Sequence, residues 1–175
     1  LAALILRPVG FKYRSKLESP RWRSNWDWAL FVGGAVPALI FGVAVGNAIL
    51  GVPFRLDDTM RMTYEGGLIT GFLGLLRPFA VLAGLVSVAM LVTHGAAWLS
   101  IKLEKGIVRD RAIRIGAIAA LATLALFALG GIYLYFGVDG YRIVGGIDPG
   151  ALPNPLRKDA EIVPGAWFAN YAQHP

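Results

Sequence analysis

The sequence contains no cysteine and little charge, with only 16% of its 175 residues being Asp, Glu, Lys or Arg. The absence of cysteine excludes disulfides, iron–sulfur clusters, thiolate metal sites and thioether-linked haem within these residues. A hydrophobic fraction of 56% is too high for an ordinary soluble domain of this length. Charged residues are absent altogether from three apolar runs, at 28–50, 79–99 and 115–137.

Each run is long enough to cross a membrane, because a helix needs about 20 residues to span a hydrocarbon core of about 30 Å. The sequence therefore predicts an all-α, polytopic transmembrane helix bundle with three full spans. The apolar stub Leu1–Leu6 predicts the end of a fourth span. Because the chain starts without Met inside this stub, we interpret residues 1–175 as a single membrane-domain fragment of a larger subunit.

The basic residues follow this topology, although a formal net charge of +6 would by itself also suit a nucleic-acid-binding protein. Loops 7–27 and 100–114 lie on the same side of the membrane and hold most of the Lys and Arg. The positive-inside rule places these two loops in the cytoplasm, and loops 51–77 and 138–175 on the outer side. Membrane topology therefore explains the net positive charge, and no nucleic-acid partner is predicted.

Small residues recur every four positions in the first span, at Gly34, Ala38, Gly42 and Gly46. This spacing puts them along one side of a helix, and small side chains let helices pack closely in lipid. Pro37 lies beside the stripe and is expected to kink the helix. The stripe predicts helix packing, so the chain is expected to need a partner.

Two connecting segments are distinctive in composition. Residues 66–76, GGLITGFLGLL, predict a re-entrant or interfacial piece that leads into Pro78, a residue suited to the first turn of a helix. The segment 138–175 is rich in Gly and Pro and predicts an ordered loop. Neither segment is expected to form a domain of its own.

Arg7 is the most informative single residue, because Pro8 follows it at the end of the apolar stub. Proline disfavours the helical conformation of the preceding residue, so this pair predicts the end of a transmembrane helix. Two hypotheses for Arg7 carry equal weight. The side chain either snorkels to the membrane interface, or faces the bundle interior and stabilises an acidic group or a haem propionate.

Acidic residues provide further candidates. Asp27, between Trp26 and Trp28, is expected to cap the first span, since a carboxylate at a helix N-terminus accepts hydrogen bonds from free N–H groups. A proton relay through Asp27 is the alternative. The outer loop carries acids interleaved with arginines, which predicts a solvated loop rather than a cation site. These acids are Asp57, Asp58 and Glu65.

Histidine and methionine are the side chains that could ligate a haem here. His94, near the end of the second span, is expected to be a packing or interfacial residue, and the methionines are expected to pack. No haem and no metal is predicted to be ligated by this chain, and no catalytic residue is assigned. The candidates are His94, His174, Met60, Met62 and Met90.

Several segments in order carry a family resemblance. They are LRPVGFKYRSK at 6–16, RWRSNWDW at 21–28, FGVAVGNAILGVPF at 41–54, RPFAVLAGLVSVAMLVTHGAAWL at 77–99, GVDGY at 137–141, NPLRK at 154–158 and GAWFANY at 165–171. The chain resembles subunit II of the cytochrome bd-type quinol oxidases. The resemblance covers essentially the whole sequence.

This resemblance implies the middle half of a subunit with about eight transmembrane helices. The implied complex is an oxidoreductase and translocase that oxidises quinol, reduces oxygen to water and builds a proton gradient without pumping. Subunit I is expected to ligate two b-type haems and one d-type haem, whereas subunit II ligates none. A heterodimer in the bacterial cytoplasmic (inner) membrane is therefore expected, with quinol and oxygen as the substrates of the complex.

The resemblance also bears on single residues. Arg7 matches an arginine of the family, for which a role near the haem groups or in assembly is implied. Lys12 stands where many members have an acid, so no role in proton entry is assigned to it. His94 stands where some members have glutamine, which argues against an axial haem ligand.

A transporter or channel subunit is the alternative function. In that case Pro37, the small-residue stripe and segment 66–76 would form a substrate path. Transporters usually place charged or polar groups at mid-membrane and contain repeated halves. The three apolar runs contain no charge and the sequence has no internal repeat, which favours the oxidase subunit.

Overall fold

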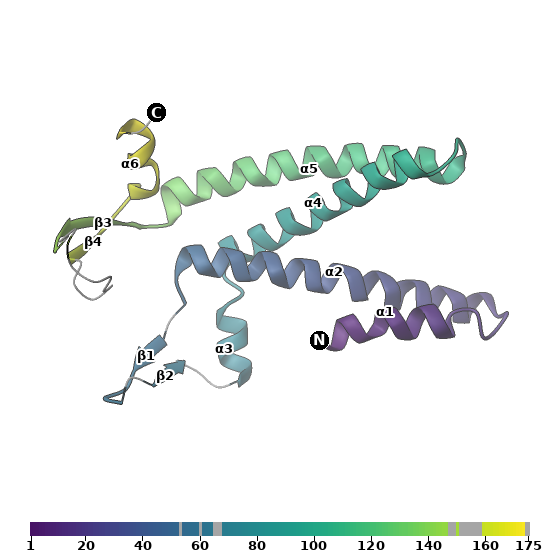
Figure 1. The fold of residues 1–175 in the computed structure, drawn as a ribbon, viewed down its shortest axis with the longest axis horizontal. Helices are drawn as coiled ribbons and strands as arrows, with labels where there is room; N and C mark the ends of the chain where they lie inside the picture. The colour runs from purple at the N-terminus through teal and green to yellow at the C-terminus, as the bar shows by residue number, and fades with distance from the viewer. Residues whose placement is uncertain (53, 60, 65–67, 147–149, 151–158, 174–175) are drawn as a thin grey trace. The chain divides into compact units, whose positions relative to one another are not determined.

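The computed structural model describes residues 1–52, 54–59, 61–64, 68–146, 150 and 159–173, and helices predominate among them (Figure 1). Two compact units are present, Leu1–Phe127 and Ala128–Pro175, and each is described by itself. The helices are α1 (Ala2–Tyr13), α2 (Pro20–Leu50), α3 (Leu68–Gly74), α4 (Pro78–Lys102), α5 (Ile107–Gly137) and α6 (Ala166–Gln173). The strands are β1 (Phe54–Leu56), β2 (Met62–Tyr64), β3 (Gly140–Gly145) and β4 (Asp159–Val163).

Three helices, α2, α4 and α5, are long and apolar enough to cross a membrane. Each contains one of the predicted spans and extends beyond it. Much of the predicted loop 7–27 is therefore helical, with only the turn between α1 and α2 outside the helices. The starting points of α2 and α4 are set locally. Pro20 and Pro78 occupy the first turns of these helices, where a missing N–H costs nothing.

Helix α1 continues through Pro8 and packs antiparallel to α2. The prediction that the helix ends at Arg7 is wrong, because α1 reaches Tyr13 with the proline inside it. A Cβ built on Gly10 would lie 2.7 Å from a side-chain carbon of Leu30, so the two helices approach closely beyond the proline. Packing against α2 compensates for the helix hydrogen bond that Pro8 cannot make.

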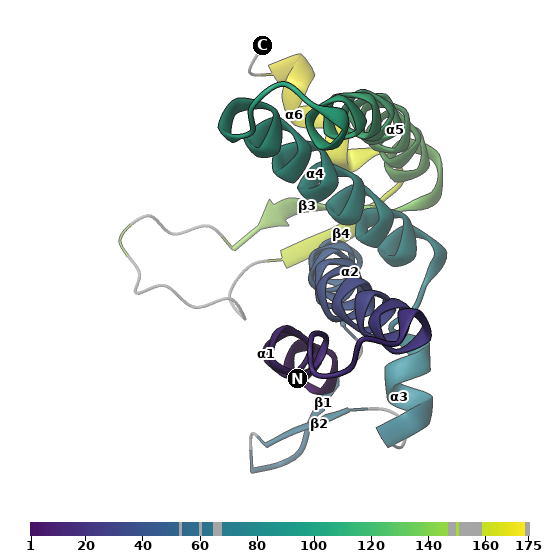
Figure 2. The same cartoon turned by 90° about the vertical axis from the view of Figure 1, so that its right-hand side faces the viewer.

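Helix α2 lies between α1 and α4 in both Figure 1 and Figure 2. Near Leu50 and Pro78 the backbones of α2 and α4 are in close contact, and toward their other ends the two helices separate (Figure 1). There α4 approaches α5 instead, since a Cβ on Gly116 would lie 2.8 Å from the Cβ of Ala96. The turn between them is closed by Arg109 Nε, which donates to the carbonyl of Ser100 at 2.9 Å.

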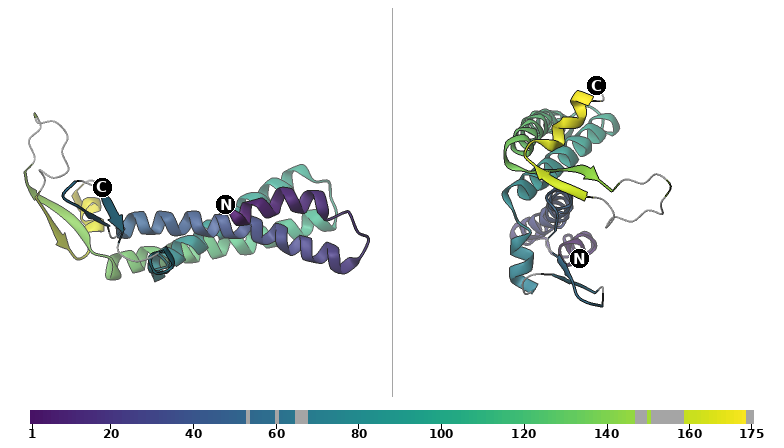
Figure 3. Two further views of the ribbon diagram at one scale, coloured as in Figure 1. Left: turned by 90° about the horizontal axis from the view of Figure 1, so that it is seen from below. Right: turned by 90° about the vertical axis from the view of Figure 1, so that its left-hand side faces the viewer.

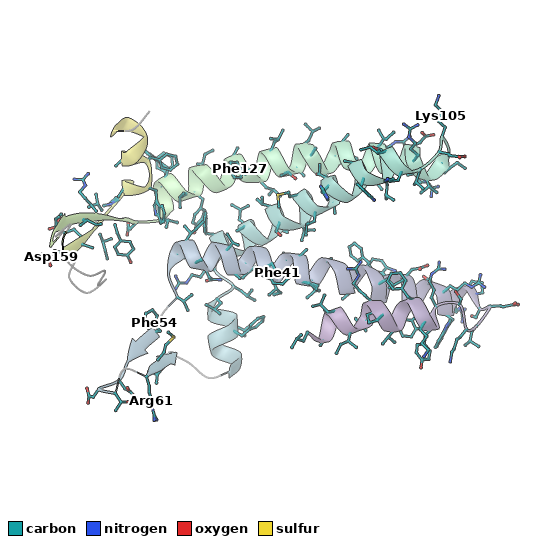
Figure 4. The ribbon with its side chains drawn as sticks, viewed as in Figure 1. Phe41, Phe54, Arg61, Lys105, Phe127 and Asp159 are labelled. Atoms are coloured by element: carbon teal, nitrogen blue, oxygen red, sulfur yellow. The ribbon has the colours of Figure 1, made fainter. Side chains whose placement is uncertain are left out.

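The buried residues of the helices are mostly small, such as Ala38, Ala80 and Ala96. Large apolar side chains point outward, and Figure 4 shows this at Phe41 on α2 and Phe127 on α5, both of which are exposed. Water-soluble helices bury such side chains, whereas membrane helices pack through small residues and present large ones to their surroundings. The packing therefore agrees with a polytopic membrane bundle.

A short hairpin follows α2. Strands β1 and β2 pair antiparallel, with Phe54 opposite Tyr64 and Leu56 opposite Met62. Helix α3 then occupies most of the predicted re-entrant piece 66–76, of which residues 66 and 67 lie outside the described residues. The sequence did not predict the hairpin, because each strand has only three residues and carries no usable alternation.

The second unit contains the end of α5, the antiparallel hairpin β3–β4 and helix α6, which lies beside β3 (Figure 3). The prediction of a loop for 138–175 is therefore wrong in part. Trp167 Nε1 donates to the carbonyl of Asp139 at 3.2 Å, and the rings of Tyr135 and Phe168 lie 5.4 Å apart. These contacts join both ends of the segment, and Gly165, at φ 71°, makes the turn into α6.

Candidate functional site

Arg7 lies in the middle of α1, with its side chain exposed. Its stem packs on α2 at Gly33, where a built Cβ would lie 3.0 Å from Arg7 Cγ and 2.8 Å from the carbonyl oxygen of Ala3. Among the described residues, Arg7 takes part in no ion pair. The guanidinium is thus on the outside of the α1–α2 pair, available to a group beyond the described part of the chain.

Asp27 has a different role from the predicted one. The prediction that it caps the helix is wrong, because α2 begins at Pro20 with Ser19 as its N-cap residue. Its carboxylate instead accepts hydrogen bonds from Arg14, from Nε to Oδ1 and from Nη2 to Oδ2, the latter at 3.1 Å. The hydrogen bond to Asp27 and the charge of Asp27 both raise the pKa of Arg14. The alternative role of Asp27, a proton relay, stays a prediction.

Aromatic side chains also contact one another at the α1–α2 turn. Tyr13 and Trp26 stack with ring centroids 6.0 Å apart, and Trp22 meets Trp26 edge-on at 5.8 Å. Trp22 Nε1 donates to the carbonyl of Tyr13 at 2.9 Å, which ties the start of α2 to the end of α1. Lys16 Nζ lies 4.6 Å above the ring of Tyr13. We call Tyr13, Arg14, Trp22, Trp26 and Asp27 the hairpin cluster.

The contact between α2 and α4 contains most of the predicted small-residue stripe. A Cβ on Gly42 would lie 2.6 Å from the carbonyl oxygen of Ala83, and one on Gly46 would lie 2.6 Å from Ala80 Cα. In the opposite direction, a Cβ on Gly84 would lie 2.9 Å from the carbonyl oxygen of Leu39. These distances leave no room for side chains. The glycine seam is Gly42 and Gly46 of α2 with Ala80, Ala83 and Gly84 of α4.

Gly34 does not belong to the glycine seam, since no atom lies within 4 Å of the position of its Cβ. The neighbouring Gly33 is the buried residue and packs on α1 instead. Of the four predicted packing positions, Gly42 and Gly46 contact α4, Ala38 is buried and Gly34 has no neighbour at its Cβ position.

Asn47 is a functional candidate that the sequence analysis missed. Its side chain is 4% exposed, and its Nδ2 donates to the carbonyls of Val43 at 2.9 Å and Leu75 at 2.7 Å. The second bond joins α2 to the segment between α3 and α4. Oδ1 is buried and has no hydrogen-bond partner among the described residues. The available signal was that Asn47 carries the only amide side chain in the apolar run 28–50.

His94 and Met90 do not pair as the two axial ligands of one haem. His94 and Met90 are exposed and lie four residues apart, hence on the same side of α4. Two residues on one helix face cannot provide axial ligands to opposite faces of one haem. In the described part of the chain, no group of three or more His, Asp or Glu could hold a metal ion. His174 and Met60 lie outside the described residues.

Comparison with known proteins accounts for this organisation. The family model "Cytochrome bd terminal oxidase subunit II" matches residues 1–171. The chain belongs to this family. The resemblance carried by its sequence segments is thereby confirmed, together with the fold class of a mostly helical chain with three candidate membrane spans.

Individual members of the cytochrome bd subunit II family support the assignment. The chain is 49% identical over all its residues to the "Probable cytochrome oxidase subunit 2" of Haemophilus influenzae. It is 45% identical over the same length to the "Cytochrome bd-I ubiquinol oxidase subunit 2" of Escherichia coli K12. The "Cytochrome bd ubiquinol oxidase subunit 2" of Bacillus subtilis is 24% identical over 74% of the chain. The chain spans 45% of the length of the Haemophilus and Escherichia proteins.

Proposed function

We propose that this chain belongs to the membrane subunit of a quinol-oxidising terminal oxidase, and that this subunit ligates no haem and supports a haem-bearing partner. The observation that carries the proposal is the family match over residues 1–171. The printed names of the relatives, subunit 2 of a ubiquinol oxidase, point to a subunit 1 as the partner. The arrangement of His94 and Met90, which cannot pair as axial ligands of one haem, is in keeping with haem being held by the partner.

In the proposed complex, haem of the b and d types in the partner supplies the redox chemistry between quinol and oxygen. The residues of this chain supply rigidity. The glycine seam fixes α2 against α4, and the hairpin cluster fixes α1 against α2. The exposed apolar faces of α2, α4 and α5 then provide surface for lipid and for the partner subunit.

The proposed location is the cytoplasmic membrane of a bacterium. The turns between α1 and α2 and between α4 and α5, together with the helix ends beside them (residues 12–23 and 102–114), carry most of the basic residues, including Lys105 at the second turn (Figure 4). We call this the basic end. The positive-inside rule supports a cytoplasmic position for the basic end, with the β1–β2 hairpin on the outer side.

Arg7 is proposed to meet an anionic group of the partner, either a carboxylate or a haem propionate. It precedes Arg14 by seven residues, so its Cα lies about 10 Å deeper along the helix axis than the basic end. A cation at this depth is costly without a partner, and the described residues provide none. The position of the side chain on the outer surface of α1 and α2 supports a partner group outside the described residues.

Variants of Arg7 in the full-length complex test this role. Arg7→Ala is expected to lower haem content and oxidase turnover, and Arg7→Lys to restore part of both. Lys12→Ala, which removes a cation from the same helix nearer the basic end, serves as the control. Unchanged haem content and turnover in Arg7→Ala would assign the residue to the membrane interface instead.

The proposed function itself is tested by purifying the full-length parent protein from its native membrane in mild detergent. A reduced-minus-oxidised visible spectrum should show haem b and haem d bands that co-purify with a second, haem-ligating chain. A colourless preparation without such a partner would contradict the oxidase assignment. In that case transport assays become the next experiment.

A further inference from the structure

The side chain of Asn47 has one atom that lacks a hydrogen-bond partner. Among the described residues, its Oδ1 is the single buried side-chain nitrogen or oxygen in this position. Its Nδ2 already uses both of its hydrogens, since it donates to the carbonyl of Val43 at 2.9 Å and to that of Leu75 at 2.7 Å. These two bonds fix the amide and identify the oxygen, because a carbonyl accepts a hydrogen bond only from the nitrogen. Buried polar atoms are almost always hydrogen-bonded, so Oδ1 requires a donor.

The start of α4 brings a buried donor to the same region. A Cβ built on Gly46, the residue before Asn47, would lie 2.6 Å from Ala80 Cα. Ala80 is the third residue of α4 and is completely buried. The first N–H groups of a helix have no partner within it and point back along its axis, here toward Leu75, whose carbonyl accepts from Asn47. We call Asn47, Leu75 and Ala80 the Asn47 site.

The polarity of the Asn47 site restricts the kind of molecule that it can bind. A cation suits Oδ1 but is repelled by the partial positive charge of the helix N–H groups. An anion suits those N–H groups but is repelled by Oδ1, which only accepts hydrogen bonds. A water molecule both donates and accepts. Buried waters make about three hydrogen bonds, mostly to polar groups that are otherwise unsatisfied.

The burial of the Asn47 site favours water over a side chain of another polypeptide. Asn47 is 4% exposed, and the residues of this chain cover it. A large side chain could reach Oδ1 only by separating α2 from α4, which are in backbone contact at Gly46. Bulk water is close, because Asn47 lies three residues before the end of α2 at Leu50, about 5 Å along the helix axis.

We propose that the Asn47 site binds one buried water molecule, which donates a hydrogen to Asn47 Oδ1 and accepts the N–H of Ala80. This water links α2 to the first turn of α4. The direct bond from Nδ2 to the carbonyl of Leu75 links α2 to the segment before α4. The amide of Asn47 thus holds the start of α4 through both of its polar atoms. The inference concerns the fold of this chain and does not depend on the oxidase assignment.

A cryo-electron microscopy map of the full-length complex that resolves ordered water tests the proposal. The wild type should show a density peak about 2.5–3.0 Å from Asn47 Oδ1 and about 2.7–3.2 Å from the nitrogen of Ala80. The peak should be lost in Asn47→Leu and retained in Asn25→Leu, the same substitution at an exposed position of α2. No peak in the wild type, or a donor group of the protein in its place, would overturn the proposal.

Hydroxyl-radical labelling provides a second measurement, in solution. Radicals formed by X-rays from an ordered water modify the side chains beside it. Val43, whose carbonyl bonds to Asn47, and Val138 have the same intrinsic reactivity and similar burial, at 5% and 8% exposed. Val43 should be labelled more than Val138 in the wild type, and this excess should be lost in Asn47→Leu but not in Asn25→Leu.

Equal labelling of Val43 and Val138 in the wild type, or an excess at Val43 that persists in Asn47→Leu, would contradict a water at the Asn47 site. The comparison within the wild type decides the question even where Asn47→Leu does not fold. Neither the density peak nor the labelling depends on oxidase turnover, so a failure of this proposal is distinguishable from a failure of the proposed function.

Discussion

Arg14 and Asp27 hold the α1–α2 turn together through two side-chain hydrogen bonds, one from each of Nε and Nη2 to its own carboxylate oxygen. A bidentate pair fixes the orientation of both side chains, which a single contact does not.

Arg14→Gln and Asp27→Asn should each lower the melting temperature of the complex. The double variant should lose less than the sum of the two losses, and the exchange Arg14→Asp with Asp27→Arg should recover part of it. Thermal unfolding at low and high salt measures this coupling. Because both side chains are exposed, the coupling should shrink as salt rises.

The glycine seam predicts opposite effects for two glycines of α2. In Gly42→Ala the new methyl group would meet backbone atoms of Ala83 and Gly84, which cannot rotate away, so the helices must separate. We expect a loss of about 1–3 kcal/mol in the free energy of unfolding, as for other overpacked sites. Gly34→Ala has open space and should be neutral or stabilising by up to about 1 kcal/mol through helix propensity. Unfolding in detergent, followed by circular dichroism, compares the two. Equal losses of unfolding free energy in Gly42→Ala and Gly34→Ala would contradict close backbone packing at Gly42.

Substitutions of Asn47 are expected to lower the stability of the protein, with Asp at this position less stable than Leu and Leu less stable than the native Asn. Asn47→Leu loses the hydrogen bonds to the carbonyls of Val43 and Leu75 and should destabilise the protein by about 1–3 kcal/mol. Asn47→Asp should be worse, since a carboxylate would face two carbonyl oxygens without a proton to donate. Hydrogen exchange should accelerate in residues 71–77 of both variants. A leucine variant with unchanged exchange there would show that the amide does not hold this segment.

Asp57 predicts a pH dependence of the β1–β2 hairpin. Its Oδ1 accepts hydrogen bonds from the hydroxyl and N–H of Thr59 and from the N–H of Arg61. The hydroxyl bond, and then the Arg61 bond, lower the pKa of Asp57 below its ordinary value of 3.8. A lowered pKa stabilises the fold above the ordinary value, and this contribution is lost as pH falls through the lower value of the folded state.

The measurement is the protection factor of the Arg61 amide, corrected for intrinsic exchange, at neutral pH and at pH values below the ordinary pKa of 3.8. Protection in the wild type should fall with pH. It should be low at every pH in Asp57→Ala, while Asp58→Ala should behave like the wild type. Protection that does not depend on pH in the wild type would refute the role of the carboxylate.

Hydropathy alone was sufficient to locate the three long helices. A charge in hydrocarbon is so costly that membrane helices exclude it, whereas a soluble helix of about 20 residues almost always carries charge on its exposed side. The same rule gave only approximate helix ends. Helix α2 begins at Pro20 and includes the polar residues of the run RWRSNWDW, which precede the apolar segment. Hydropathy marks the apolar segment but not a helix start among polar residues.

Packing partners were harder to predict, and Gly33 and Gly34 show why. Residues eight apart on a helix differ in direction by about 80°, so Gly34 is rotated well away from Gly42 despite the regular spacing. Which of the two adjacent glycines is buried depends on where α1 lies, and this is a property of the tertiary structure. The pairings of Asp27 with Arg14 and of Asn47 with Leu75 likewise depend on contacts between segments distant in sequence.

Pro37 stands between the part of α2 that carries the glycine seam and the part that packs on α1. A proline removes one backbone hydrogen bond from the middle of a helix and lowers its resistance to bending there. Helix α2 therefore consists of two segments joined at Pro37, one packed against α4 and the other packed against α1. A displacement of α1 is therefore expected to bend α2 at Pro37 more easily than it separates the close contact of Gly42 and Gly46 with α4.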